Sequence, residues 1–324
     1  MTFAQETSRL YLNEYTIPLN KKGAAIGKIF NKEGAVTNAK ILKDEAGLFT
    51  IRKGVLQLKK KAALPAAGDF KYEVSVQSGD DVAAFVLVKD AFIKNKVIAH
   101  RGAWKNHAGS ENSITSLKDA IKIGCEGSEF DLWLSSDNEI VVSHDPHIGG
   151  KAVEETSLAE LQTVQLKNGD RVPTLEEFIK VAMDQHTTRL VVEMKPSAKG
   201  KGELLATKTV AMIHAMKAQA WVYYISFDYN ILKKVLELDP LAKVAYLSGN
   251  KSPEQLKADK MWGLDYHMGE FEKNKQLIQD AKSKGITTNV WTVNDPAAMD
   301  VLLKDGVDYI TTNEPEILLE KVKK

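Results

Sequence analysis

The sequence predicts an α/β protein in which a small all-β sandwich precedes a (β/α)8 barrel of the TIM type. From residue 95 onward, short apolar runs alternate with segments whose apolar residues recur every three or four positions. Residues 1–94 contain only short alternating runs broken by Gly, Asp and Asn. This change of pattern predicts two domains, residues 1–94 and 95–324.

Strand-like runs in the N-terminal part occupy residues 24–34, 48–64, 70–79 and 81–92. Their even spacing favours a β-sandwich, and residues 47–81 resemble a cadherin-like repeat. The acidic calcium motifs of such repeats are missing, and Lys59, Lys60 and Lys61 stand where an acidic pair would follow "LQL". We therefore expect a sandwich without calcium and a solvated lysine run, with contact to an anionic surface as the less favoured interpretation.

The C-terminal part contains strand-like and helix-like segments in alternation, roughly eight βα units, which fits a closed parallel barrel. Pro173 and Thr174 precede an acidic turn, as at a helix start. A doubly wound open sheet is the alternative, but no G-x-G-x-x-G follows the first strand. The expected strands are 97–102, 127–135, 139–145, 189–195, 221–228, 243–249, 263–269, 287–293 and 307–313, and the expected helices are 113–124, 174–185, 204–219, 229–240, 274–285 and 296–306.

Bulk composition narrows the function classes. The 324 residues include 44 Lys or Arg and 43 Asp or Glu, so the net charge of +1 does not indicate a nucleic-acid partner. No apolar run is long enough to span a bilayer. The single cysteine, Cys125, is expected to be a buried small hydrophobe. The oligomeric state is left open.

Carboxylates lie at the ends of two expected barrel strands. Glu129 and Asp131 are two residues apart and so face the same side of a strand, and Glu193 ends another. Three converging carboxylates repel one another unless a cation lies between them, and a hard divalent ion prefers oxygen ligands. The alternative is a buried structural network in which these acids pair with Arg101 and Lys195.

Two histidines, His100 and His144, end expected strands that we take to be neighbours. Such a pair can serve as general base and general acid near neutral pH. The fork of Arg101 suits phosphate oxygens, and a salt bridge to Glu129 or Glu193 is its structural alternative.

Several motifs together resemble the glycerophosphodiester phosphodiesterase family, and they cover essentially all of residues 96–324 in order. The family pattern has Pro and Thr where this chain has Ser110 and Ser113, changes that affect a loop and a helix cap. The resemblance also implies a short insertion near residues 147–171. The motifs are "AHRGA" (99–103), "ENS" (111–113), "EFDLWLSSDNEIVVSHD" (129–145), "VPTLEEF" (172–178), "VVEMKP" (191–196), "ISFD" (225–228) and "VWTVN" (290–294).

The resemblance implies a hydrolase of lipid metabolism that cleaves a small glycerophosphodiester to glycerol 3-phosphate and an alcohol, with one divalent cation, Mg²⁺ or Ca²⁺. Water or a hydroxyl of the substrate could be the first nucleophile. Asn294 is a less certain contributor, and His107, His147 and His267 could reach the site. The implied roles are acid–base catalysis for His100 and His144, metal ligation for Glu129, Asp131 and Glu193, phosphate binding for Arg101 and Lys195, a place near the metal for Glu111, and apolar walls for Phe227 and Trp291.

Three other functions are less favoured by the sequence. A phospholipase D-like enzyme acting on intact lipids would need exposed apolar loops near the site. A catalytically inactive binding barrel would lack a histidine or a carboxylate, and all are present. An adhesion or glycan-binding role for the sandwich is disfavoured, because the sequence shows neither calcium motifs nor an evident aromatic platform there.

The N-terminus suggests a location. Thr2, Phe3 and Ala4 before Gln5 are typical of the end of a signal peptide whose earlier part is absent from this chain. This predicts an extracytoplasmic, periplasmic or secreted protein, which would favour calcium over magnesium. A frayed terminus of a cytoplasmic protein is the alternative.

Overall fold

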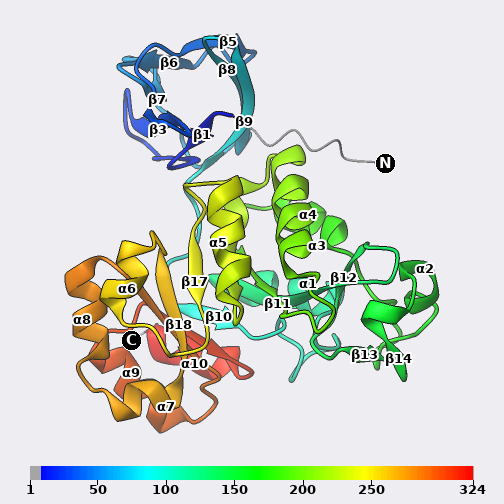
Figure 1. Cartoon of the computed structure of the whole chain (residues 1–324). Coiled ribbons are helices and arrows are strands. Elements are labelled where there is room, and N and C mark those ends of the chain that lie inside the picture. Colours follow the sequence, from blue (N-terminus) through cyan, green and yellow to red (C-terminus); the bar gives the residue numbers. More distant parts are fainter. Residues whose placement is uncertain (1–8, 324) are drawn as a thin grey trace.

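The computed structural model describes residues 9–323, so the predicted signal-peptide remnant at residues 2–5 lies outside the described residues. Figure 1 shows a small β unit beside a larger barrel surrounded by helices. The predicted boundary at residues 94 and 95 falls between the last strand of the first unit, β9 (Asp81–Lys89), and the first barrel strand, β10 (Val97–Ala99).

The N-terminal unit consists of two sheets that curl around a shared apolar interior (Figure 1). One sheet has the order β1-β3-β7-β6, with β4 on the edge of β3, and the other has the order β2-β9-β8-β5. Alternating residues such as Val74 and Val76 are buried, which is the period-two pattern read from the sequence. The remaining strands are β1 (Tyr11–Leu12), β2 (Thr16–Ile17), β3 (Ala25–Asn31), β4 (Gly34–Ala35), β5 (Lys40–Asp44), β6 (Phe49–Arg52), β7 (Val55–Leu58) and β8 (Lys71–Ser78).

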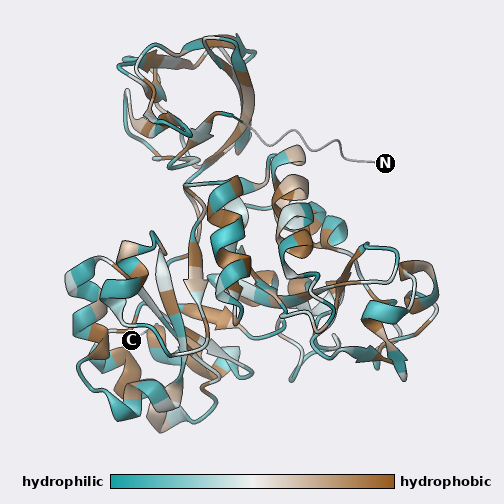
Figure 2. Cartoon of the chain, viewed as in Figure 1, coloured by the Kyte–Doolittle hydropathy of each residue, from teal (hydrophilic) through white to brown (hydrophobic). Residues whose placement is uncertain are grey.

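The C-terminal unit is a closed barrel of parallel strands, which confirms the predicted (β/α)8 fold. Its strand order is β10-β20-β19-β18-β17-β16-β15-β11, and β10 also pairs with β11. This closing pair rules out the open doubly wound sheet. The strands are mostly apolar and the surrounding helices carry polar residues (Figure 2). The bounds are β11 (Gly127–Leu134), β15 (Arg189–Met194), β16 (Val222–Ser226), β17 (Val244–Tyr246), β18 (Gly263–His267), β19 (Thr287–Trp291) and β20 (Tyr309–Thr312).

One expected barrel strand is wrong. Residues 139–145 contain β12 (Ile140–Val142), which pairs antiparallel with β11 and lies outside the barrel. Ser135 and Glu139 close a tight turn between these two strands, through a hydrogen bond of 3.0 Å from Ser135 N to Glu139 O. A parallel crossover needs about a dozen residues, so a connection this short can only form a hairpin.

The six expected helices are present, and caps define several of them. Ser113 caps α1 (Ile114–Ile123) and Thr174 caps α3 (Leu175–Met183), each through a capping box. The shorter α6 (Pro253–Ala258) was not predicted, although its capping box at Ser252 was a usable signal. Three further helices were not predicted either: α2 (Leu158–Leu161), α7 (Met268–Lys273) and α10 (Pro315–Val322). The remaining helices are α4 (Gly202–Ala215), α5 (Tyr229–Leu238), α8 (Leu277–Lys284) and α9 (Pro296–Asp305). In the described chain no helix has the length and hydrophobicity to cross a bilayer.

The insertion predicted near residues 147–171 is compact. It contains the hairpin β13 (His147–Ile148) and β14 (Lys151–Ala152), a 3-10 turn at Val153–Glu155, and α2. A small apolar cluster of its own holds it against β12, formed by Val141, Ile148, Val153, Leu161 and Val172.

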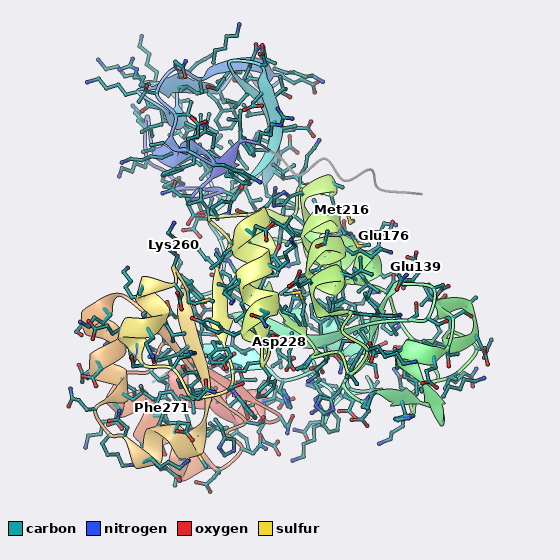
Figure 3. All side chains as sticks on the ribbon, viewed as in Figure 1. Glu139, Glu176, Met216, Asp228, Lys260 and Phe271 are labelled. Atoms are coloured by element: carbon teal, nitrogen blue, oxygen red, sulfur yellow. The ribbon has the colours of Figure 1, made fainter. Side chains whose placement is uncertain are left out.

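The β unit packs against the amino-terminal end of the barrel, opposite to the end where parallel strands finish. In Figure 3, Met216 at the end of α4 lies on the side of the β unit, whereas Asp228 at the start of α5 lies away from it. Buried residues of both units belong to one continuous hydrophobic core. Two ion pairs cross the interface, Glu73 with Lys217 (N–O distance 2.7 Å) and Glu14 with Lys243 (3.8 Å). The rings of Phe70 and His186 stack with centroids 4.4 Å apart, and Arg189 Cζ lies 3.8 Å from the centroid of the Phe92 ring.

Phe92 → Ala tests this interface. Phe92 is buried between the Arg189 guanidinium and the edge of Trp221, so its removal leaves a cavity and an uncovered charge. We expect a loss of about 3–5 kcal/mol in the free energy of unfolding, measured by urea denaturation. Leu42 → Ala, at an exposed position of β5, is the control and should change stability by less than about 0.5 kcal/mol. Equal effects of the two substitutions would contradict a packed interface.

Candidate active site

The site lies at the carboxyl ends of the neighbouring strands β10, β11 and β15. Strand β11 carries Glu129 and Asp131, and β15 carries Glu193 directly beside Asp131 in the register. Ligand oxygens of the three carboxylates all lie within 4.8 Å of one another, and all three side chains are buried. The convergence predicted from their spacing is therefore present.

Lys195 bridges two of these acids. Its Nζ lies 2.8 Å from Asp131 Oδ1 and 2.5 Å from Glu193 Oε1. Burial alone would lower the pKa of Lys195, but the two carboxylates raise it above the ordinary value. The structural network that was the alternative interpretation is thus partly present.

This network does not neutralise the cluster. Glu129 Oε1 is buried and has no hydrogen-bond partner among residues 9–323. Burial, with the neighbouring acids, raises the pKa of Glu129 well above its ordinary value and that of Glu193 to about 8. Burial also opposes ionisation of Asp131, but Lys195 and Asn112 lower the pKa of Asp131 below its ordinary value.

The acidic cluster has an excess of negative charge. Four carboxylates and two cationic side chains leave a net charge of −2 when all are ionised: Glu111, Glu129, Asp131 and Glu193 against Arg101 and Lys195. A divalent cation would supply the balance, and a set of carboxylate oxygens suits Mg²⁺ or Ca²⁺. The donor set and the unpartnered Glu129 oxygen therefore fit a metal site.

Arg101 is held by a strained backbone. Its φ of 59° lies in the left-handed region, and so does that of Gly102 at 82°. This bend lets Arg101 N donate to Glu129 Oε2 at 2.8 Å. A Cβ on Gly102 would lie 2.4 Å from Ser116 Oγ, so only glycine fits where the chain passes α1.

The side chain of Arg101 reaches toward the same cluster. Its Nη1 lies 2.6 Å from Glu111 Oε2, and its Nε is 3.9 Å from Asp131 Oδ2. Buried Arg101 Nε has no hydrogen-bond partner within the described chain. This buried donor therefore faces the acidic cluster, with Asp131 as its nearest charged neighbour.

Asn112 fixes the orientation of Asp131, a role that the sequence analysis missed. Its Nδ2 donates to Asp131 Oδ2 at 2.8 Å, and its Oδ1 accepts from Asp131 N at 3.1 Å. Asn112 also has a positive φ, 56°. The "ENS" motif contained it, but only the tertiary contact shows what it holds.

His100 follows β10 and faces the triad. Its Nδ1 lies 2.8 Å from Asn313 Oδ1, an acceptor, so Nδ1 carries the hydrogen and Nε2 is left as a lone pair. That Nε2 is 4.0 Å from Glu129 Oε2. Burial and the charge of Arg101 lower the pKa of His100 to about 4. Asn313 was not foreseen, although it directly follows the last barrel strand.

His144 reaches the rim by a different route from the one expected. The sequence predicted His100 and His144 on neighbouring barrel strands, but His144 follows β12, outside the barrel. The hairpin brings it back to the carboxyl end, because Ser143 N bonds to Asp131 O at 3.0 Å. His144 is half exposed, and its Nδ1 lies 2.7 Å from Asp145 Oδ1.

An aromatic wall stands at the end of β16, the neighbour of β15, and at the ends of β18 and β19 farther round the barrel. The rings of Phe227 and Trp291 meet edge to face at 5.4 Å, and His267 meets Trp291 at 5.2 Å. Trp291 Nε1 donates to Asp265 O at 2.8 Å, which fixes the ring. These residues end β19 and β18 or follow β16.

Other residues near the mouth have structural contacts. Asn294 Oδ1 accepts from Asn313 N at 2.9 Å, so it supports the loop that holds His100. His107 bonds to Glu316 at 2.7 Å and ties its loop to α10. Away from the mouth, just before β11 begins, Cys125 is fully buried, and burial raises the pKa of its thiol.

Comparisons with known proteins agree with this geometry. The model of the glycerophosphoryl diester phosphodiesterase family matches residues 100–317. A glycerophosphodiester phosphodiesterase of Caldanaerobacter subterraneus is 29% identical over 250 residues, 72% of this chain and 99% of its own length.

Solved structures show the same likeness. A glycerophosphodiester phosphodiesterase from Parabacteroides distasonis is 41% identical with a TM-score of 0.69, over 70% of this chain and 96% of the other. A phosphodiesterase from Oleispira antarctica, solved with the product sn-glycerol-3-phosphate, is 26% identical with a TM-score of 0.63, over 71% of this chain and 97% of the other. These matches do not test the cadherin-like resemblance of the β unit.

Asn112 → Ala tests the support of the acidic cluster. Without its two hydrogen bonds, Asp131 is free to rotate away from Glu129 and Glu193. We expect metal affinity, measured by titration calorimetry with Ca²⁺ and Mg²⁺, to fall about 10- to 100-fold. Asn106 → Ala, on the exposed loop near Glu314, is the matched control and should bind metal as the wild type does. An unchanged affinity in Asn112 → Ala would refute the orienting role.

Proposed function

Because the chain belongs to the glycerophosphoryl diester phosphodiesterase family, we propose that it hydrolyses small glycerophosphodiesters to glycerol 3-phosphate and an alcohol. The observation that carries this proposal is the meeting of a buried carboxylate triad, two histidines and the Arg101 guanidinium at one end of the barrel. Each group has a task in phosphodiester cleavage.

The phosphate would lie over the triad, within reach of Arg101 and Lys195. Glu129, Asp131 and Glu193 would hold one divalent cation, Mg²⁺ or Ca²⁺, which when bound stabilises negative charge on phosphoryl oxygens. The guanidinium of Arg101, which is partly exposed, would supply positive charge to the same group. The glycerol moiety would rest against Phe227 and Trp291.

His100 is the proposed general base. Asn313 holds its Nδ1–H, so Nε2 can take a proton from the attacking oxygen, whether water or a neighbouring hydroxyl of glycerol. His144 is the proposed general acid. As the P–O bond to the alcohol breaks, His144 donates a proton to the leaving oxygen, and the carboxylate of Asp145 keeps its ring oriented.

Cleavage of intact lipids in the manner of phospholipase D has less support. The large hydrophobic side chains exposed in the described chain are scattered over the β unit and the helices and form no patch at the site: Leu42, Val82, Leu204, Val301 and Ile317. The apolar residues beside His144, including Ile148, Val164 and Leu166, line the walls of a cleft and are not exposed on a loop.

The two histidines and the metal requirement are tested together. In glycerophosphocholine and glycerophosphoethanolamine assays, His100 → Ala and His144 → Ala should each lower kcat about 10²- to 10⁴-fold, because each removes one proton transfer. Release of glycerol 3-phosphate should stop after chelation and return with Ca²⁺ or Mg²⁺ added singly.

His186 → Ala is the matched control, because this histidine stacks on Phe70 at the end of the barrel opposite to the site. Its loss should be much smaller than that of either catalytic variant. Full activity in the chelated enzyme, or in either catalytic variant, would contradict the mechanism.

A further inference from the structure

A cleft of about 440 Å³ opens beside the carboxylate triad. One wall is the loop 104–112, and the other is formed by residues 142–149 and by residues 164–168 of the insertion. Glu111, Asn112 and His144 line it. Asn112 also bonds Asp131, so one residue that lines the cleft directly contacts the triad.

The cleft and the aromatic wall lie on opposite sides of the triad. The wall belongs to β16, β18 and β19, whereas the cleft lies over the hairpin of β11 and β12. A diester with its phosphate over the triad therefore extends one substituent toward each. His144, the proposed acid, lines the cleft, so the leaving alcohol belongs on that side.

We propose that this cleft binds the leaving alcohol and selects an uncharged polyol over a small ammonium alcohol such as choline or ethanolamine. This inference rests on the proposed function and specifies its substrate. Size is the first argument. At roughly 30 Å³ per water, the cleft has room for about fifteen waters, several times what the heavy atoms of ethanolamine need.

Charge is the second argument. A quaternary ammonium group prefers aromatic cages and free carboxylates. Of the two carboxylates that line the cleft, Glu111 pairs with Arg101 at 2.6 Å, whereas Asp145 bonds His144 at 2.7 Å with most of its side chain facing solvent at the rim. The lining also includes Lys167, a cation that opposes an ammonium group.

Hydrogen-bonding capacity is the third argument. The side chains of His147, Gln165 and Lys167 line the cleft, and within residues 9–323 they make no hydrogen bond. They are therefore available to hydroxyl groups. Trp104 adds one aromatic face, and its Nε1 donates to His100 O at 3.2 Å, which fixes the indole.

The cleft is preformed. Buried Ser110 joins its two walls, because Ser110 Oγ donates to Asn168 Oδ1 at 3.0 Å and accepts from Asn168 N at 2.9 Å. A ligand entering it meets walls that are already ordered, which lowers the entropic cost of binding. Ser110 stands where the family pattern has proline, and a proline could not make these two hydrogen bonds.

The test compares kcat/KM for glycerophosphoinositol, glycerophosphoglycerol, glycerophosphoethanolamine and glycerophosphocholine, with the metal that supports turnover. The two polyol diesters should be preferred by about tenfold or more. Gln165 → Trp, which fills the cleft, should reduce that preference by about tenfold. Gln276 → Trp, exposed at the start of α8 and outside the cleft, is the matched control and should keep it.

The outcomes separate the two proposals. Preference for the choline or ethanolamine diester would overturn the polyol assignment while leaving the hydrolase intact. An equal loss for all four substrates in Gln165 → Trp, with an unchanged melting curve, would overturn the location of the subsite. No turnover of any of the four by the wild-type enzyme would overturn the proposed function itself.

Discussion

The buried charge of Glu129, Asp131 and Glu193 is the constraint on which the site depends. Burying one uncompensated carboxylate is costly, and burying three together is possible only with matched partners. Lys195 bridges two of them, Asn112 orients one, and the backbone N–H of Arg101 serves another. The strain at Arg101 and Asn112, both at positive φ, is explained by these contacts, because each residue is bent to reach the cluster.

The two ends of the barrel have different roles. Its amino-terminal end is covered by the β unit, through ion pairs and stacked rings such as Phe70 on His186. Its carboxyl end carries the ionisable groups on strand ends and short loops. The end of the barrel that packs against the β unit is therefore separate from the end that carries the strained and charged residues.

Much of the fold was accessible from the sequence, because hydrophobic period and turn residues report local structure directly. Six helices and the barrel strands were predicted, whereas α2, α6, α7 and α10 were not. The strand at 139–145 was assigned to the barrel because an isolated apolar run does not show which neighbour it pairs with. The length of the turn at Ser135–Glu139 was the clue that it forms a hairpin.

The sequence by itself determined which chemistry is present: carboxylates two residues apart on a strand, histidines at strand ends, and a cationic fork beside one of them. Their convergence could be anticipated because parallel strands end on one side of a barrel. Only the tertiary structure decided the partners, since Asn313 reaches His100 and Asn112 reaches Asp131 from segments whose position depends on barrel closure. The cleft beyond His144 likewise exists because the insertion folds back against the loop 104–112, and no local pattern encodes that contact.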